Sequence, residues 1–322
     1  AAEWAEEEFA GARLYDARLR RRLYTLAEDF FAQPGVLIPQ ACSGSPAQSK
    51  AAYRFFDNAR VDMQSLLKGH VEATAQRMQP HAVVLAVQDT TTLNYTAHPA
   101  TEGLGPINTQ KDQSVGLLLH DTLAFTLEGT PLGLVDVQCW ARDPAQAGTK
   151  RAQRNQLPIE AKESVKWLRS YRATAAVQQL CPSTLVVSVG DREADLHELF
   201  WEAQQTAAGP KLLVRAERTR QRKVEAASAE EHEYLWQKLG AEPVGGHQVL
   251  AIPRQGSRPA RTATLEVRYA AVTLRPPERS KALAVAAWAV YAREVEPPPE
   301  IAEPLEWMLL TTVAVETFEQ AI

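Results

Sequence analysis

Two short runs of apolar residues, far apart in the chain, set the framework for everything between them. Residues 82–87 read AVVLAV and residues 184–189 read TLVVSV. Runs of this kind, bounded by polar residues, are typical of strands buried on both faces of a sheet. Each run is followed by an aspartate, Asp89 after the first and Asp191 after the second. The sequence therefore predicts two buried strands, each ending at an acidic side chain.

The segments around these runs predict a mixed α/β sheet. Apolar periodicity and turn residues indicate three more strands and two helices: strands at 115–126, 132–140 and 211–215, and helices at 159–180 and 192–206. The first two of these strands suit an antiparallel hairpin. The order strand, strand, strand, helix, strand, helix, strand matches the ribonuclease-H-like core. In that core the first and fourth strands are neighbours, so we expect Asp89 and Asp191 to converge.

The first 80 residues have helical periodicity instead. Expected helices cover residues 1–30, the stretch that follows Ser45-Pro46, and residues 62–78. Short helices with arginines at 18 and 20–22 could form a DNA-reading module. An ordinary helical cap on a larger domain is the alternative.

The sequence pattern changes again near residue 217. Strand-like pieces are broken by glycine and proline, with a short helix among them: strands at 248–252, 263–267, 271–274 and 283–291, and a helix at 230–239. We interpret 217–304 as a mainly β insertion, after which a core strand resumes at 307–312. The predicted domains are therefore a helical domain, a catalytic core, the insertion and a return to the core: 1–80, 81–216, 217–304 and 305–322.

Charge and cysteine content limit the possible partners and the cellular compartment of the chain. The formal net charge is -4, but residues 211–281 hold 14 basic and 8 acidic residues, a local balance of +6. Such a segment could face a polyanion, or be a solvated, ion-paired surface. Three widely spaced cysteines argue against a zinc site or a disulfide scaffold and for a reducing compartment. No apolar run approaches membrane-spanning length, so we expect a cytoplasmic protein without a membrane partner.

Asp89 and Asp191 are the candidate chemical groups. Two converging carboxylates repel each other unless a proton or a cation lies between them. Hard oxygen ligands favour Mg²⁺ or Mn²⁺. Two such ions can activate a nucleophile and stabilise the leaving oxygen of a phosphodiester. Alternatively, Asp89 is a turn residue and Asp191 the N-cap of the helix that follows it.

A phosphatase of the haloacid dehalogenase class is a rival interpretation. Asp89 followed by threonine, with Asp191 and Asp195 later, resembles the nucleophile and metal-binding acids of that class. That class has a second acid two residues after the nucleophile, where this chain has Thr91. It also has a parallel sheet with alternating helices, whereas residues 115–140 predict a hairpin.

Six parts of the chain together point to one family. They are 3–5 (EWA) with 49–56 (SKAAYRFF), 88–91 (QDTT), 162–167 (KESVKW), 190–195 (GDREAD), 212–215 (LLVR) and 304–311 (PLEWMLLT). In this order they resemble the DDE transposases of the insertion-sequence-four family, over nearly the whole chain. The segment 190–195 is the most specific of them.

The resemblance implies roles for particular residues. Asp89 and Asp191 would be catalytic metal ligands, with two Mg²⁺ or Mn²⁺ ions in the intact site. Contacts with DNA would come from a further set: Thr91, Lys162, Lys166, Arg192, Arg215, Arg218, Arg220 and Trp307. Trp307 would stack on a base flipped out at the transposon end; a core tryptophan is the alternative. The implied partners are double-stranded DNA, as inverted-repeat ends and target, and a second copy of the chain.

The sequence departs from the family pattern near its end. The family's third acid is a glutamate in a Tyr-x-x-Arg-x-x-x-Glu helix, and neither Glu316 nor Glu319 has that context. With no initiator methionine and no such helix, we expect a partial chain. Two hypotheses follow. One is a cut-and-paste transposase of the bacterial nucleoid that nicks ends, forms a hairpin and joins the 3′-hydroxyl to target DNA. The other is a DNA-binding chain without catalysis.

Overall fold

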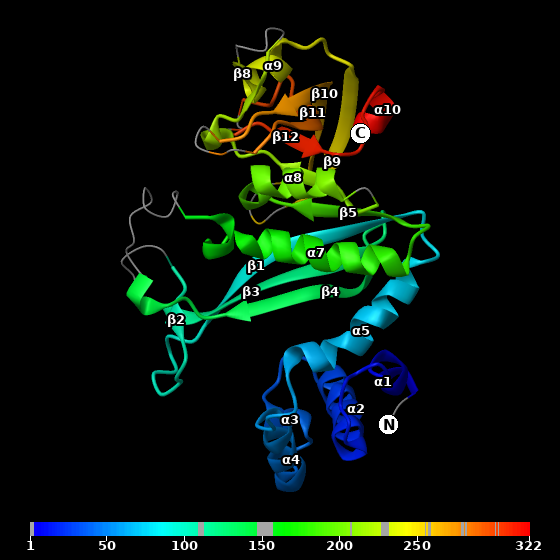
Figure 1. Cartoon of the computed structure of the whole chain (residues 1–322), viewed down its shortest axis with the longest axis vertical. Helices are drawn as coiled ribbons and strands as arrows, with labels where there is room; N and C mark the ends of the chain where they lie inside the picture. Colours follow the sequence, from blue (N-terminus) through cyan, green and yellow to red (C-terminus); the bar gives the residue numbers. More distant parts are fainter. Residues whose placement is uncertain are drawn as a thin grey trace.

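A computed structural model describes most of the chain, in three parts stacked along its longest axis (Figure 1). The described residues are 3–108, 113–146, 157–206, 208–226, 232–254, 256, 259–277, 280, 282–299, 301 and 303–322. N-terminal helices occupy one end, a sheet crossed by a long helix lies in the middle, and a strand-rich part forms the other end (Figure 1). This arrangement puts the candidate site in the middle part.

Five helices form the N-terminal part: α1 (Glu3–Glu8), α2 (Ala17–Ala32), α3 (Ile38–Ala41), α4 (Pro46–Phe56) and α5 (Met63–Met78). The single helix expected over 1–30 is wrong, because the chain turns between α1 and α2. Asp16 caps α2 by accepting a hydrogen bond from Arg18 N at 2.8 Å. Ser45 and Asp62 cap α4 and α5 in the same way.

The strands of the described residues form one twelve-stranded sheet. They are β1 (Val83–Asn94), β2 (Gly105–Pro106), β3 (Val115–Phe125), β4 (Pro131–Trp140), β5 (Leu185–Gly190), β6 (Lys211–Arg215), β7 (Lys223–Glu225), β8 (His232–Tyr234), β9 (Gly246–Ile252), β10 (Arg261–Leu274), β11 (Val285–Glu294) and β12 (Glu306–Thr311). The main path runs β2-β3-β1-β5-β6-β12-β11-β10-β7-β8, while β4 pairs with β3 and β9 with β10. The sheet is mixed, as the sequence predicts.

The strand that carries Asp89 and the strand that precedes Asp191 are parallel neighbours. Their register runs from Val83 opposite Leu185 to Val87 opposite Val189, which confirms the expected adjacency. The expected end of the first strand at Asp89 is wrong, because β1 continues to Asn94. Antiparallel pairing with β3 keeps β1 extended beyond the point where its pairing with β5 stops.

The helices of the middle part are shorter than expected. A 3-10 turn η2 (Ile159–Ala161) precedes α7 (Val165–Leu180), where one helix over 159–180 is predicted. Likewise a 3-10 turn η3 (Arg192–Ala194) precedes α8 (His197–Gln205) in place of one helix over 192–206. In both places the chain makes a tight turn before the regular helix begins, which brings the residues just before the helix close to the sheet.

Helix α7 crosses the sheet and covers one of its faces (Figure 1). Gln138 of β4 donates to the Lys166 carbonyl at 2.9 Å and to Ser170 Oγ at 2.8 Å, and Ser170 donates to Asp136 at 2.7 Å. Helix α5 packs on the same face, around a core that includes Met78. On β1 the residues facing these helices are buried, whereas alternate residues on the other face stay partly exposed.

Beyond β6 the chain forms the strand-rich part. The separate strands expected at 263–267 and 271–274 are one continuous strand, β10. The short helix expected over 230–239 is α9 (Leu235–Ala241), and Glu230 lies outside the described residues. The strand expected at 307–312 is β12, which pairs with β6 on one side and with β11 on the other. The short helix α10 (Phe318–Ala321) packs on β10.

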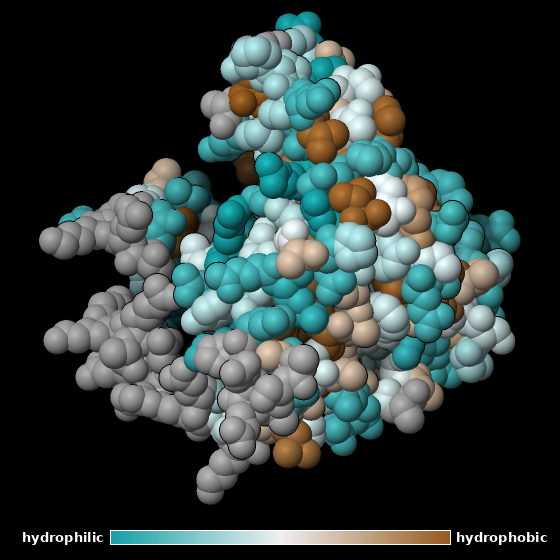
Figure 2. Space-filling model, turned by 90° about the horizontal axis from the view of Figure 1, so that it is seen from above, coloured by the Kyte–Doolittle hydropathy of each residue, from teal (hydrophilic) through white to brown (hydrophobic). Residues whose placement is uncertain are grey.

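Hydrophilic side chains predominate on the face seen in Figure 2, and hydrophobic ones are scattered over it. Across the described ranges, no helix has both the length and the apolar character needed to span a membrane. Cys42 and Cys181 are buried free cysteines, and Cys139 is an exposed one. The domain boundaries given above remain predictions.

Candidate functional site

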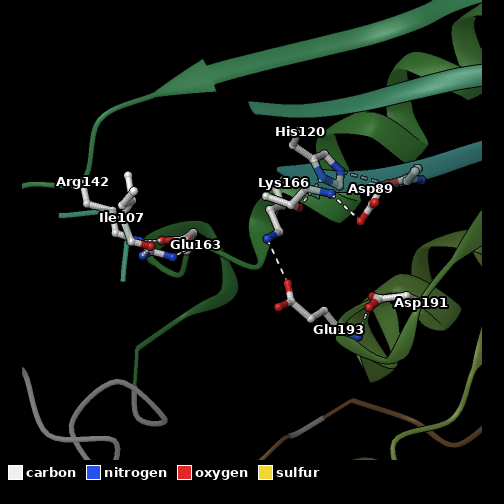
Figure 3. A network of polar contacts seen from close by, with 10 residues as sticks. Asp89, Ile107, His120, Arg142, Glu163, Lys166, Asp191 and Glu193 are labelled. Carbon is white, nitrogen blue, oxygen red and sulfur yellow. Dashed lines mark hydrogen bonds and ion pairs between the residues drawn. The ribbon is translucent and has the colours of Figure 1, made fainter. Parts of the chain in front are cut away.

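Asp89 lies in β1, and Asp191 directly follows β5, the parallel neighbour of β1. Each aspartate is two residues beyond the last paired residues, Val87 and Val189. Neighbouring strands are about 4.8 Å apart, and residues two apart along a strand share a face. Figure 3 shows both side chains in the same region, with Lys166 and Glu193 beside them. The topology thus brings together two acids that are far apart in the sequence.

Both aspartates are exposed, and each makes one local hydrogen bond. Asp89 Oδ1 accepts from Thr90 N at 2.7 Å, and Asp191 Oδ1 accepts from Glu193 N at 2.8 Å. The second bond makes Asp191 the N-cap of η3, so the capping role proposed as an alternative is present. One oxygen of each carboxylate is used in this way, which leaves the other for a ligand.

The donor set fits a magnesium ion that keeps part of its water shell. Mg²⁺ is commonly held by one or two carboxylates together with waters and substrate phosphates. Asp89 and Asp191 supply two such carboxylates, one in β1 and one directly after the neighbouring strand β5. No group of three or more His, Cys, Asp or Glu side chains that could hold a metal occurs in the part of the chain that the structure describes.

A chain of polar side chains runs beneath Asp89, on the buried face of the sheet. Thr90 Oγ1 lies 2.8 Å from His120 Nδ1, and His120 Nε2 lies 3.3 Å from Gln88 Oε1. Gln88 in turn donates to Ser188 Oγ at 2.8 Å. The chain links three adjacent strands, β3, β1 and β5.

His120 is fully buried within this chain. Its ring packs edge-on against Trp167 of α7, with centroids 4.7 Å apart. The pKa of His120 is lowered to about 4, mainly by burial and then by the positive charge of Lys166, while Asp89 opposes the change. At neutral pH the imidazole is therefore uncharged, which suits its contacts with the uncharged Gln88 and Thr90.

Asp121 lies directly opposite Asp89 on the antiparallel strand β3. Partial burial raises the pKa of Asp121, and the negative charge of Asp89 adds to that rise. Like charges that face each other across a strand pair destabilise a sheet. A cation near Asp89 would relieve this repulsion. Our sequence analysis missed both His120 and Asp121, although each occurs in a strand that it predicted.

The predicted DNA-contacting residues near the aspartates differ in exposure. Thr91 and Arg192 are exposed, whereas Lys162 is half-buried at the end of η2. Lys166 is buried, and its ammonium lies 3.0 Å from Glu193 Oε2 and 5.7 Å from the Trp167 ring. The structure thus ties α7 to the turn that follows Asp191.

The predicted basic residues after β6 are partly engaged within the protein. Arg215 is exposed at the end of that strand. Arg218, in the 3-10 turn η4 (Arg218–Arg220), pairs with Glu306 and lies 4.9 Å over the Trp236 ring. The guanidinium of Arg220 donates to the Asp195 carbonyl.

Asp195 organises this basic loop. Its side chain is completely buried and pairs with Arg222, while its second oxygen accepts from Glu217 N at 3.0 Å. The last acid of the segment 190–195 is thus a buried partner of the loop. Its resemblance to a phosphatase metal ligand is not matched by this environment.

Trp307 lies in β12, opposite Ala292, and is half-buried. Its neighbour Met308 is completely buried. The stacking role and the core position beside Leu309 both stay predictions. Part of the indole is accessible.

Comparison with known proteins gives two findings. Residues 1–61 match the family described as transposase DNA-binding. The cryo-EM structure of a piggyBac transposase synaptic complex with hairpin DNA is similar at 9% sequence identity with a TM-score of 0.34. That match covers 84% of this chain and 41% of the other, so this chain spans less than half of its length. The matched segment covers helices α1 to α4 and relates this part of the chain to transposases.

Proposed function

We propose that this chain is a DNA transposase of the DDE type that holds divalent cations between Asp89 and Asp191. The observation that carries the proposal is the parallel pairing of β1 and β5, the two neighbouring strands from which the chain leads to Asp89 and Asp191. The strand order β4-β3-β1-β5-β6, with α7 crossing from β4 to β5, supports a ribonuclease-H-like core. The N-terminal family match supports DNA as the partner.

In this proposal the two carboxylates hold Mg²⁺ or Mn²⁺, and the remaining ligands are water and DNA phosphate oxygens. Bound ions would activate the attacking water or 3′-hydroxyl and stabilise the leaving oxygen of the phosphodiester. Asp89 and Asp191 would hold the ions in place, because one oxygen of each carboxylate is already fixed by a backbone N–H. Cleavage, hairpin formation and strand transfer would then be successive phosphoryl transfers at one site.

DNA would approach along the exposed basic residues near this site. Arg192 follows Asp191 directly, and Arg215 ends the strand next to β5. Contacts of this type with phosphates position a duplex without reading its sequence. The half-buried Trp307 is two strands from β5, since β12 pairs with β6. We assign it the stacking role on an unpaired base. A second copy of the chain would bring the two ends together.

Binding without cleavage is the second candidate function. It is favoured by one observation, that no third acid joins the aspartate pair among the described residues. A phosphatase is disfavoured, because β1 is flanked by the antiparallel strand β3 on one side.

The test uses duplex DNA from the ends of the element that encodes this chain. Wild type, Asp89→Asn and Asp191→Asn are incubated with labelled ends and Mn²⁺, and both gel shift and strand cleavage are measured. Glu128→Gln is the matched control, since Glu128 is an exposed acid in the turn between β3 and β4. We expect binding by all four proteins and cleavage only by wild type and the control. Shifted but uncut DNA with wild type would support binding alone, and loss of all binding would refute the proposal.

A further inference from the structure

The buried polar chain beneath Asp89 has no role in the proposed function so far. We infer that His120 is a positioning residue for the metal-binding pair, acting through the two residues that flank Asp89. The inference rests on the proposed function, because it assumes that Asp89 binds a cation. It adds a group on the opposite face of the sheet, which touches neither metal nor DNA.

The geometry joins His120 to both neighbours of Asp89. Thr90 follows Asp89 and lies 2.8 Å from His120 Nδ1, while Gln88 precedes Asp89 and lies 3.3 Å from Nε2. Alternate residues of a strand point to opposite faces, so anchoring Gln88 and Thr90 on the buried face fixes the direction of Asp89 on the other. One imidazole therefore contacts the side chains of both residues that flank the proposed ligand.

The same chain extends to the strand that carries the second aspartate. Gln88 donates from Nε2 to Ser188 Oγ at 2.8 Å, and Ser188 lies three residues before Asp191. Because β1 and β5 meet only up to Val87 and Val189, this bond lies at the end of their paired region. It holds the two strands together where the aspartates emerge.

The donors and acceptors assign a single protonation pattern to the chain. Since the Gln88 amide nitrogen donates to Ser188, its oxygen faces His120 and accepts from Nε2–H. The uncharged ring then has a lone pair at Nδ1, which accepts the Thr90 hydroxyl proton. Every buried polar atom of His120 is thereby satisfied, and Trp167 packs against the ring from α7.

Partners of metal ligands usually matter for affinity. Changing such outer groups typically weakens metal binding roughly 10- to 100-fold. His120 acts one residue further away, through Gln88 and Thr90, so we expect an effect of roughly 10-fold, at the lower end of that range.

Mn²⁺ binding measured by electron paramagnetic resonance of the free ion tests the inference without any DNA cleavage. The proteins are wild type, Asp89→Asn, His120→Phe and His120→Asn, and the melting temperature of each is recorded. Phenylalanine keeps the shape of the ring and removes both links, whereas asparagine keeps an acceptor near the Nδ1 position. We expect the dissociation constant to rise roughly 10-fold for His120→Phe and less for His120→Asn.

Thr122→Val is the matched control. Thr122 lies two residues along the same strand, on the same buried face, and its hydroxyl has no hydrogen-bond partner among the described residues. We expect its affinity for Mn²⁺ to stay within about twofold of wild type. Should His120→Phe fail to fold, Thr90→Val removes the contact between Thr90 and His120 Nδ1 with a nearly isosteric side chain.

The outcomes separate the two proposals. If Asp89→Asn loses Mn²⁺ and the variant that cuts the His120 link binds it as well as wild type, the positioning role is overturned and the metal site stands. An effect of Thr122→Val equal to that of His120→Phe also overturns it, because any change in the buried face would then suffice. If wild type binds no Mn²⁺, or Asp89→Asn binds it equally well, the proposed metal site fails and the positioning role fails with it.

Discussion

Replacing Asp195 by asparagine probes how the acidic segment after β5 holds the basic loop 217–222. Asp195 is 0% exposed and the side chain of Arg222 is 9% exposed, so the two form a buried ion pair. The Asp195 carbonyl also accepts from Arg222 at 3.0 Å, and the carboxylate accepts from Glu217 N at 3.0 Å. The substitution removes the negative charge and leaves the guanidinium buried without its counter-ion.

The size of the effect follows from that burial. Removing one partner of a buried pair costs about 3–5 kcal/mol, mainly because the remaining charge is unpaired. Asparagine can still accept from Glu217 N through its amide oxygen, so we expect the lower end, about 3 kcal/mol. With an unfolding entropy of about 2.1 cal/mol/K per residue, a chain of 322 residues loses about 1.5 °C of melting temperature per kcal/mol. Asp195→Asn should therefore melt about 4–5 °C below wild type.

A double-mutant cycle separates the ion pair from general damage to the loop. Calorimetry compares wild type, Asp195→Asn, Arg222→Met and the double variant. Because the double variant buries no charge, it should be more stable than the sum of the single losses by at least about 1 kcal/mol. The control is Arg172→Met, whose partner Glu202 is 2.6 Å away but whose own side chain is 52% exposed; it should cost about 0–1 kcal/mol.

Two results would refute this reasoning. One is a loss below about 1 kcal/mol for Asp195→Asn, which would equal that of the exposed pair. The other is strict additivity in the cycle, which would mean that Asp195 and Arg222 do not stabilise each other.

Three further predictions concern other parts of the sheet. Glu294→Gln, at a buried carboxylate whose pKa is lowered by hydrogen bonding to Arg261, should cost about 3 kcal/mol at pH 7. The stability that this carboxylate contributes is present above the ordinary glutamate pKa of 4.5 and is lost as pH falls through the lower pKa of the folded protein. The difference in unfolding free energy between wild type and variant, measured with urea, should therefore shrink below pH 4.5 and still be seen at pH 6. Asp121→Asn should stabilise the metal-free protein by about 0.5 kcal/mol, because it removes a like charge opposite Asp89; a loss of stability in the same unfolding assay would contradict this. Gln178→Leu should cost about 3 kcal/mol by chemical denaturation, because the amide makes three buried backbone hydrogen bonds at the end of α7, and a neutral result would show that water replaces it.

The pairing of β1 with β5 was open to prediction from the sequence because simple rules limit it. Two apolar runs joined by a hairpin and a crossover helix must become parallel neighbours or leave their faces uncovered. The extension of β1 past Asp89 was not predictable in the same way. Residues 90–94 are polar except for Leu93, and they are extended because β3 pairs with them. The sequence of residues 90–94 alone does not show that β3 pairs with them.

His120 escaped prediction for a related reason. On β3, apolar residues occupy both alternating phases, with Leu117, Leu119 and Leu123 on one face and Leu118 and Ala124 on the other. The sequence alone therefore does not show which phase is buried. Packing of α5 and α7 decides it, and the decision puts a histidine in the core beneath the proposed ligand.

Counting charges in the basic segment 211–281 does not show which of its side chains are paired within the protein. An excess of arginine and lysine over 211–281 is visible in the sequence, but the partners of these residues are not. Glu306 lies 88 residues from Arg218, and Asp195 lies 25 residues from Arg220. Both arginines are thus oriented by internal contacts before any polyanion arrives. A phosphate must either share these guanidinium groups with their acceptors or displace them. In the proposed DNA complex, Arg218 and Arg220 would therefore be fixed in direction at some cost in affinity, whereas the exposed Arg215 would contact phosphates without giving up such a partner.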